Sequence, residues 1–277
     1  MRWTPGGRSP NLEDRRSMGG GMGRGLGIGG TVVVLALSLL FGRNLFSDLG
    51  VEPGVAAGAG APMSAADSTA EEGQVQFVSF VLDDVQDTWA KTLPNYGAQF
   101  HPAKLVLFRN STSSGCGGAQ EAMGPFYCPL DERVYLDLGF FDELQQKFGA
   151  SGDFARAYVL AHELGHHVQH LLGTDAKVRR LQETNPSEAN QLSVRLELQA
   201  DCYAGVWAHS TDQRRLLEQG DVDEALNAAA SVGDDRIQKQ TTGRVNVDSF
   251  THGSAAQRSE WFKRGFESGD PRNCNTL

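Results

Sequence analysis

The sequence predicts an α+β fold that is predominantly helical with a small β-sheet, preceded by one N-terminal transmembrane helix. Three observations support this prediction. Apolar residues recur every three or four positions in several long stretches, as they do on one face of a helix. Two short runs, 104–108 and 133–138, have the β-rich or alternating character of strands. A charge-free apolar run at residues 25–42 precedes them.

The apolar run from Gly25 to Gly42 contains 18 residues without a charge, near the lower limit for crossing a hydrocarbon core of about 30 Å. A cleaved secretory signal and a buried core helix are the alternatives. The basic, Gly-rich residues 1–24 carry five arginines, which predicts a cytoplasmic N-terminus. We therefore expect a single-pass protein of the cell membrane, anchored through residues 25–42, whose folded domain lies in the periplasm or outside the cell.

The composition indicates which partners the protein is not expected to bind and whether its cysteines form disulfides. The formal net charge is −9, and the basic residues of the first 24 positions leave a still more acidic body, which argues against nucleic-acid binding. Four cysteines without a Cys-x-x-Cys spacing indicate two disulfides rather than a Cys₄ zinc site. Cys116 with Cys128 would close a short Gly-rich loop, and Cys202 with Cys274 follows by elimination. Buried free thiols are the alternative.

A stretch rich in small residues separates the N-terminal part of the chain from the folded domain. Residues 43–74 are rich in Ala, Gly and Pro and are expected to form a flexible linker, so that the folded domain covers residues 75–277. The domain begins with apolar residues four apart from Phe77 to Trp89, which predict a helix that Pro94 ends. The two predicted strands follow, and then a short helix over residues 140–148.

Four further helices are predicted in the second half of the domain. The first is capped by Ser151 or Asp153 and ends at Gly173. The second begins at Asn185-Pro186 and runs to about His209. The last two run from Asp221 toward Gln240 and from Ser254 to Gly269, separated by a polar loop.

The first of these four helices contains a His-Glu-x-x-His pattern. His162 and His166 are four residues apart, so a helix brings both imidazoles to one side, where they can bind one metal ion. Glu163 stands next to that ion and can act as the general base toward water that the metal activates. A surface helix with two solvated histidines is the alternative. His167 and His170 lie off this face and are interpreted as solvated or supporting residues.

A metal with two histidine ligands needs at least one more protein ligand, and the next helix offers a carboxylate. Glu197 lies in an apolar stretch, where a buried carboxylate needs a partner, and it would complete a His₂Glu site with one position open. Asp201, one turn later, could accept the free N–H of a ligating histidine. A solvated pair is the alternative. His252, in the polar loop, could stabilise an oxyanion, although an ordinary loop histidine is the favoured interpretation.

These motifs resemble known metallopeptidases. His-Glu-Leu-Gly-His at 162–166 followed by Glu-Leu-Gln-Ala-Asp at 197–201 resembles the gluzincins. More narrowly, the chain resembles the bacterial, YpfJ-like family of putative neutral zinc metallopeptidases. The matching stretches are 124–129, 134–138, 161–169, 195–202, 233–238, 248–254 and 261–271. The resemblance implies a zincin-like domain with one Zn²⁺ per chain, the ligands His162, His166 and Glu197, and Glu163 as catalytic base.

The function expected from the sequence is that of a membrane-anchored, extracytoplasmic zinc endopeptidase acting on a peptide or protein substrate. Residues 133–138 are expected to pair with the extended substrate along a free strand edge. Two alternatives stay open. One is a membrane-tethered binding or scaffold protein with a structural metal, and the other is a hydrolase of a non-peptide amide such as a cell-wall bond.

Overall fold

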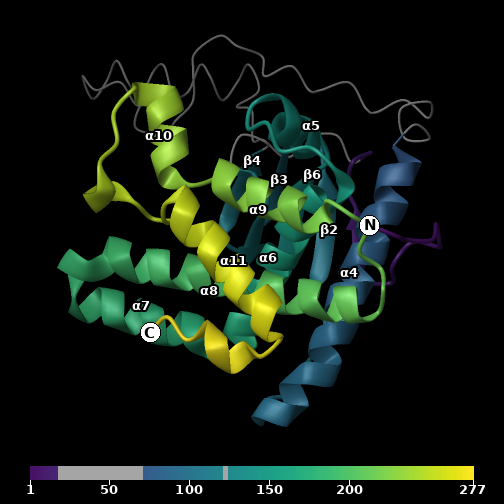
Figure 1. Ribbon diagram of the computed structural model, residues 1–277, viewed down its shortest axis with the longest axis horizontal. Helices are drawn as coiled ribbons and strands as arrows, with labels where there is room; N and C mark the ends of the chain where they lie inside the picture. The colour runs from purple at the N-terminus through teal and green to yellow at the C-terminus, as the bar shows by residue number, and fades with distance from the viewer. Residues whose placement is uncertain (18–70, 121–123) are drawn as a thin grey trace, which may run out of the picture.

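The computed structural model describes residues 1–17, 71–120 and 124–277 (Figure 1). The strands are β1 (Leu12–Asp14), β2 (Lys104–Phe108), β3 (Ser111–Ser114), β4 (Gly117–Gln120), β5 (Phe126–Cys128) and β6 (Arg133–Asp137). The α-helices are α4 (Glu72–Thr92), α5 (Gly139–Gln146), α6 (Asp153–Leu171), α7 (Thr174–Thr184), α8 (Ala189–Gln213), α9 (Asp221–Ser231), α10 (Asp234–Thr242) and α11 (Ala255–Ser268). Short 3₁₀ turns are η1 (Leu93–Tyr96), η3 (Pro186–Glu188), η4 (Val247–Ser249) and η5 (Pro271–Cys274).

The main sheet has four strands in the order β1-β2-β6-β5. The first three are parallel, and β5 is antiparallel to β6. The prediction that residues 133–138 offer a free edge is wrong, because β6 has a hydrogen-bonded neighbour on each side. The edge strand on this side of the sheet is β5, which pairs with β6 alone. β3 and β4 form a separate hairpin.

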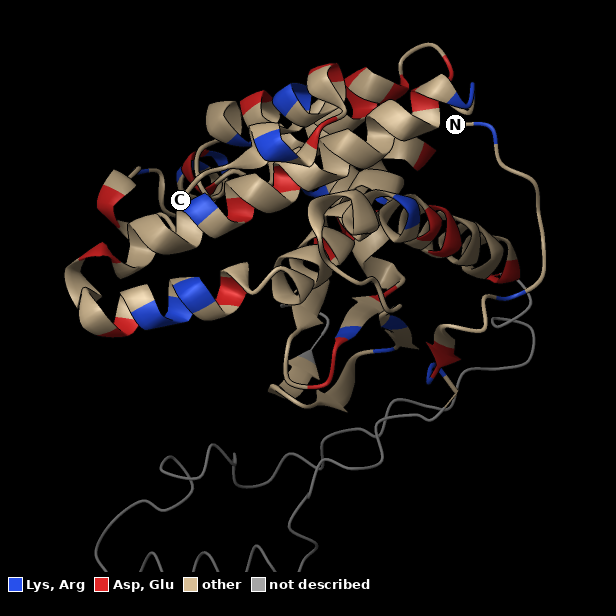
Figure 2. Cartoon of the chain, turned by 90° about the horizontal axis from the view of Figure 1, so that it is seen from below, with Lys and Arg blue, Asp and Glu red and all other residues tan. Residues whose placement is uncertain are grey.

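The helices enclose an apolar core against this sheet. Trp207 of α8 stacks on Phe154 of α6, and Trp89 of α4 packs edge-on against Tyr203 of α8. α8 and α11 lie side by side along much of their length (Figure 1). Acidic and basic residues are interspersed along the outer faces of the helices (Figure 2). The apolar faces point into the core, and packing of such faces supplies most of the stability of helices in globular proteins.

Two disulfides hold loops to this framework. Cys116, in the turn between β3 and β4, is bonded to Cys128 of β5. Cys202 of α8 is bonded to Cys274 of η5 near the C-terminus. Both pairings are the ones that the sequence favours. The first fixes the β3–β4 hairpin to the edge strand β5.

The structure divides one predicted helix and adds elements that were not predicted. The stretch from Asp221 toward Gln240 forms two helices, α9 and α10, with a break at Gly233. A Cβ at Gly233 would lie only 2.3 Å from the backbone N of Ala255, so the chain bends where the start of α11 approaches. Helix α7 and four of the six described strands, β1, β3, β4 and β5, were not predicted from the sequence.

The predicted membrane span and localisation require correction. In residues 1–17, 71–120 and 124–277, the structure contains no helix that is both long and apolar enough to cross a bilayer. The predicted transmembrane helix, residues 25–42, lies outside the described residues, as does most of the predicted linker. The fold class that stands is a mostly helical α+β fold with small sheets, and the single-pass localisation is not supported.

The packing of residues 1–17 gives a physical reason for this correction. β1 pairs in parallel with β2 of the domain. The side chain of Arg16 is 1% exposed and forms ion pairs with Asp14 and with Glu71 at the start of α4. One membrane crossing between residues 25 and 42 would put these partners on opposite sides of the bilayer. The contacts therefore conflict with the predicted cytoplasmic N-terminus and external domain.

Candidate metal centre

The two motif histidines lie on α6 and face α8. Their ring centroids are 4.8 Å apart, as expected for residues one helical turn apart. Gly165 lies between them in sequence, and a Cβ at that position would approach the carbonyl oxygen of Ala200 in α8 to 3.0 Å. The glycine thus lets α6 and α8 pack closely. This close approach brings the carboxylate of α8 within reach of both imidazoles.

Glu197 supplies that carboxylate. Its oxygens lie 3.1 Å from Nε2 of His162 and 3.5 Å from Nε2 of His166. One ligand atom from each of the three residues lies within 4.8 Å of the others. Burial alone would raise the pKa of Glu197, but the two imidazoles hold it well below its ordinary value. These three side chains therefore converge from two helices, and nitrogen and oxygen donors of this kind fit Zn²⁺.

Asp201 lies one turn further along α8 and is fully buried. Its carboxylate is 2.8 Å from Nδ1 of His162, on the side of the ring opposite Glu197. Burial alone would lower the pKa of His162, but Asp201 and Glu197 raise it to about 10. Asp201 occupies the position predicted for a residue that fixes the tautomer and orientation of a ligating histidine.

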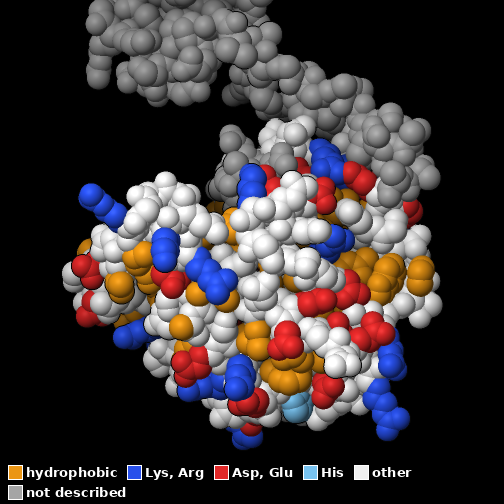
Figure 3. Space-filling model, turned by 45° about the horizontal axis from the view of Figure 1, so that its top comes forward, with side chains coloured by type: hydrophobic (Ala, Val, Ile, Leu, Met, Phe, Trp, Pro, Cys, Tyr) orange, Lys and Arg blue, Asp and Glu red, His pale blue; other side chains and the backbone are white. Residues whose placement is uncertain are grey.

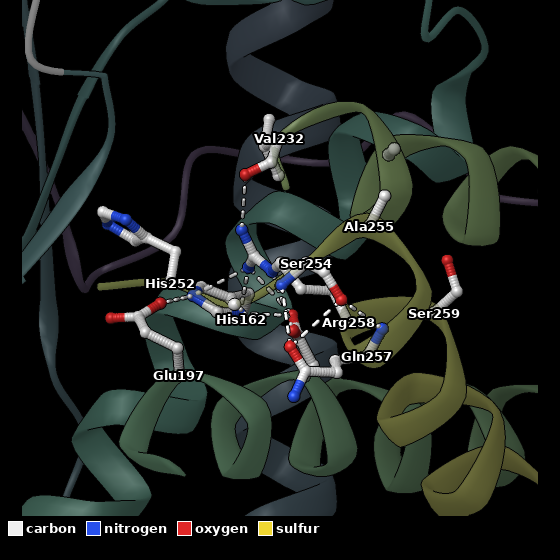
Figure 4. A network of polar contacts seen from close by, with 12 residues as sticks. His162, Glu197, Val232, His252, Ser254, Ala255, Gln257, Arg258 and Ser259 are labelled. Atoms are coloured by element: carbon white, nitrogen blue, oxygen red, sulfur yellow. Dashed lines mark hydrogen bonds and ion pairs between the residues drawn. The ribbon is translucent and has the colours of Figure 1, made fainter. Parts of the chain in front are cut away.

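Two residues that the sequence reasoning missed complete this network. Arg258 of α11 donates from Nε and Nη2 to the two oxygens of Asp201, at 2.8 and 3.0 Å. The hydroxyl of Tyr158 donates to Asp201 at 2.5 Å. Figure 4 shows Arg258 between His162 and the carbonyl oxygen of Val232, to which it also donates. Asp201 thus has a buried counter-charge, which a carboxylate in a low-dielectric interior requires.

Glu163 lies beside this network and lines a cleft of about 650 Å³ that also contains His162, His166 and Glu197. Its side chain is mostly buried, and burial raises its pKa above the ordinary value of a glutamate. A carboxylate with a raised pKa is a stronger base. The structure therefore places a candidate base in the same cleft as the three candidate ligands.

His252 also lines the cleft, and Asp234 at the start of α10 fixes its loop. The Asp234 carboxylate accepts backbone N–H groups from Thr251, His252 and Gly253, at 2.6–2.9 Å. Nδ1 of His252 is 3.3 Å from the other oxygen of Asp234, and this hydrogen bond raises the pKa of His252. The loop histidine is thus held where its side chain lines the cleft. Asp234 was not identified from the sequence.

The other two histidines of α6 have structural partners. His167 is 1% exposed, accepts a hydrogen bond from the Tyr127 hydroxyl at Nδ1, and donates from Nε2 to the His101 carbonyl oxygen. His170 is 2.9 Å from Asp175. His167 therefore connects α6 to the edge strand β5, which carries Tyr127. This is a supporting role, one of the two interpretations that the sequence left open.

Comparison with known proteins places the chain in a family. The family model described as "Putative neutral zinc metallopeptidase" matches residues 1–277. The chain is 47% identical to the uncharacterized protein YpfJ of Escherichia coli strain K12 over 292 residues, covering 100% of this chain and 99% of YpfJ. It is 48% identical to the uncharacterized protein Rv2575 of Mycobacterium tuberculosis strain H37Rv over 206 residues, which is 70% of this chain and 68% of that protein. No solved structure matches significantly. The chain belongs to the family of putative neutral zinc metallopeptidases.

Proposed function

We propose that this protein is a zinc-dependent endopeptidase in which His162, His166 and Glu197 hold one Zn²⁺ and Glu163 is the general base. The observation that carries the proposal is the position of Glu163. It is a second carboxylate, 8% exposed, in the same cleft as the three converging ligands. Structural zinc sites are usually closed by four protein ligands, whereas a site with three protein ligands that opens into a cleft is typical of catalytic zinc.

Bound zinc would act as a Lewis acid that makes water a nucleophile at neutral pH. Side chains of the protein would carry out the proton transfers and orient the ligands. Glu163 takes the proton from the attacking water and passes it to the leaving amine, and its raised pKa suits both transfers. Asp201 holds the Nδ1–H of His162 so that Nε2 faces the ligand side.

Two further parts of the cleft have roles in this proposal. His252, oriented by Asp234, donates a hydrogen bond to the oxyanion that forms when the scissile carbonyl is attacked. The edge strand β5, rather than β6, pairs with the backbone of an extended substrate, since residues 125–127 line the cleft. Removing one oxyanion donor typically lowers kcat about 10²- to 10³-fold, and we expect a loss of this size for His252→Ala, which removes the donor, without loss of zinc.

The first test of the proposal is Glu163→Gln in the zinc-loaded protein, assayed on a mixture of unstructured peptides. We expect peptide hydrolysis to fall by about 10²-fold or more while zinc content stays unchanged, because Gln cannot take a proton. Glu143→Gln is the matched control, since Glu143 lines the same cleft but is paired with Lys147. Undiminished turnover in Glu163→Gln would refute the mechanism. A wild-type protein that binds zinc but cleaves only a non-peptide amide, or nothing, would favour one of the two alternatives above.

A further inference from the structure

Gln169 lies on α6 one turn after His166, and its side chain connects the two helices that carry the candidate metal ligands. Its Oε1 is 2.8 Å from Nδ1 of His166. Its Nε2 donates to the backbone carbonyl oxygen of Leu196 at 2.7 Å and to Oε1 of Gln199 at 3.1 Å, both on α8. Leu196 directly precedes Glu197 in the chain. One amide therefore contacts a ligand on α6 and the backbone next to the ligand on α8.

The carbonyl group of Leu196 fixes which way the Gln169 amide points. A backbone carbonyl oxygen can only accept hydrogen bonds, so it requires the NH₂ of Gln169 and leaves the amide oxygen facing His166. That oxygen accepts the proton of Nδ1, which leaves Nε2 of the neutral imidazole unprotonated. Nε2 of His166 is the atom that faces Glu197, at 3.5 Å. Gln169 thus presents the nitrogen of His166 that a metal ion needs.

A second glutamine extends this chain of hydrogen bonds to a disulfide. Nε2 of Gln199 donates to the backbone carbonyl oxygen of Cys274 at 3.0 Å, so Oε1 of Gln199 is the atom that faces Gln169. Cys274 belongs to η5, and its disulfide to Cys202 ties η5 to α8 three residues after Gln199. The Cys202–Cys274 disulfide therefore keeps the last acceptor of the chain in place.

The two glutamine side chains are enclosed in the interior. Charged side chains lie at the surface among hydrophobic patches on the face drawn in Figure 3. Gln169 is in contrast fully buried, and Gln199 is 6% exposed. An amide that turned over would leave buried polar groups unpaired, which is costly away from water. If Gln199 turned over, its NH₂ would meet the NH₂ of Gln169 and favour the wrong orientation of the second amide.

We propose that Gln169 positions His166 for metal binding and that the Cys202–Cys274 disulfide supports this position through Gln199. The affinity for zinc then depends on a disulfide that contacts no metal ligand itself. The inference rests on the proposed function, because it needs His166 as a zinc ligand. Gln169 is a positioning residue, since it acts on the metal through the imidazole that it holds.

The first measurement is the zinc affinity of the full chain, by competition with a chromophoric chelator at one pH. Gln169→Met keeps the length of the side chain without the amide and should lower the affinity about 10- to 100-fold. Gln169→Glu should keep it within about 3-fold of the wild type, because a carboxylate still accepts the Nδ1 proton. Both variants lose the donor to Leu196 and should unfold at lower urea concentration without zinc, so a purely structural role would lower the affinity in both.

The matched control for this measurement is Gln182→Met. The Gln182 amide also donates to a backbone carbonyl and to a side-chain oxygen of α8, those of Ala189 and Ser193, at 3.1 and 2.9 Å. Its hydrogen bonds within the described residues reach none of the three candidate ligands. Gln182→Met should therefore leave the zinc affinity unchanged.

The second measurement removes the disulfide by replacing Cys202 and Cys274 together with Ser, which leaves no free thiol. Zinc affinity should fall about 3- to 10-fold, less than for Gln169→Met, because Leu196 still orients the amide. In the Gln169→Met background the same replacement should cause no further loss, since the effect passes through Gln169. Gln199→Met interrupts the chain with the disulfide intact and should also lower the affinity about 3- to 10-fold, which keeps the test decisive if the Ser variant does not fold.

The control for this second measurement is the other disulfide. Replacing Cys116 and Cys128 together with Ser removes a bond between the β3–β4 turn and β5. That bond has no part in the chain of amides, so the zinc affinity should stay unchanged.

The outcomes separate this inference from the function on which it rests. A loss in Gln169→Met that Gln169→Glu avoids, with no further loss on removing the Cys202–Cys274 disulfide, supports the inference. Equal affinity in Gln169→Met and wild type, or an equal loss in both Gln169 variants, overturns the positioning role. An unchanged affinity in Gln199→Met, or the same disulfide effect with and without the Gln169 amide, overturns the coupling. These results leave the zinc peptidase intact, whereas a wild-type protein that binds no zinc refutes the proposed function and this inference together.

Discussion

Replacing Arg258 with Met should strongly destabilise the protein, because it removes the counter-charge of a buried carboxylate. The Arg258 and Asp201 side chains are 5% and 0% exposed, and their ion pair spans 2.8 Å. Breaking a buried pair by removing one partner typically costs about 3–5 kcal/mol, most of it from the charge left without compensation. We expect a loss of about this size in the free energy of unfolding for Arg258→Met.

The same reasoning predicts how two substitutions combine. Asp201→Asn alone leaves the Arg258 guanidinium buried without a partner, so it should also be costly. In the double variant neither charge remains, and we expect its loss to be smaller than the sum of the single losses by about 2 kcal/mol or more. Asn at position 201 can still accept the hydrogen bond from Tyr158.

Urea unfolding at neutral pH in the presence of a chelator would measure these free energies, since bound metal would otherwise stabilise the folded state by mass action. The control cycle uses Arg179→Met and Asp175→Asn on α7. That pair spans 3.1 Å, but Arg179 is 51% exposed, so we expect a coupling of about 0–1 kcal/mol. If the Arg258 and Asp201 losses add within about 0.5 kcal/mol, Arg258 is not the counter-charge that the structure indicates.

Two further predictions concern packing and pH. Gly265→Ala should destabilise the protein by about 3 kcal/mol in thermal unfolding, because its Cβ would lie 1.9 Å from the Cys202 carbonyl oxygen and force α11 away from α8. Gly73→Ala is the control and should have little effect, because a Cβ at Gly73 would meet nothing within 4 Å. An equal melting temperature for Gly265→Ala and wild type would contradict this close helix contact. Burial lowers the pKa of His167 to about 4. Because the unfolded state then binds a proton that the folded state does not, stability should be lost as pH falls from about 6.5 to 4, by up to about 3 kcal/mol. His167→Phe loses the contact with Tyr127 at every pH, but it should remove this contribution to the dependence of the unfolding free energy on pH. An identical pH dependence in the variant and the wild type would refute the prediction.

The local part of the site could be predicted from the sequence because helix geometry is local. Two histidines four residues apart must share one side of a helix, and the structure brings His162 and His166 together with Glu197 in this way. Glu197 required the further argument that a carboxylate in an apolar stretch needs a partner. Arg258 could not be predicted, because it reaches Asp201 across 57 positions, and nothing in its own helix distinguishes it from the half-exposed Arg264.

The arrangement of the fold was less accessible for the same reason. Residues 104–108 and 133–137 form strands as predicted, but their order in the sheet depends on contacts between distant segments, so the edge was assigned to the wrong strand. β1 has only three residues, Leu12 to Asp14, two of which are acidic. It forms because β2 offers a parallel edge, which no local pattern reveals. The break at Gly233 likewise depends on the approach of a later helix.

The most direct test of the central claim is the zinc content of the purified protein, measured by mass spectrometry for wild type, Glu197→Ala and Glu143→Ala. The structure predicts about one zinc ion per chain in the wild type and in Glu143→Ala, because Glu143 lines the cleft without contributing to the three-residue cluster. It predicts that zinc is lost or bound far more weakly in Glu197→Ala. Equal zinc in all three proteins, or none in the wild type, would contradict the His₂Glu centre.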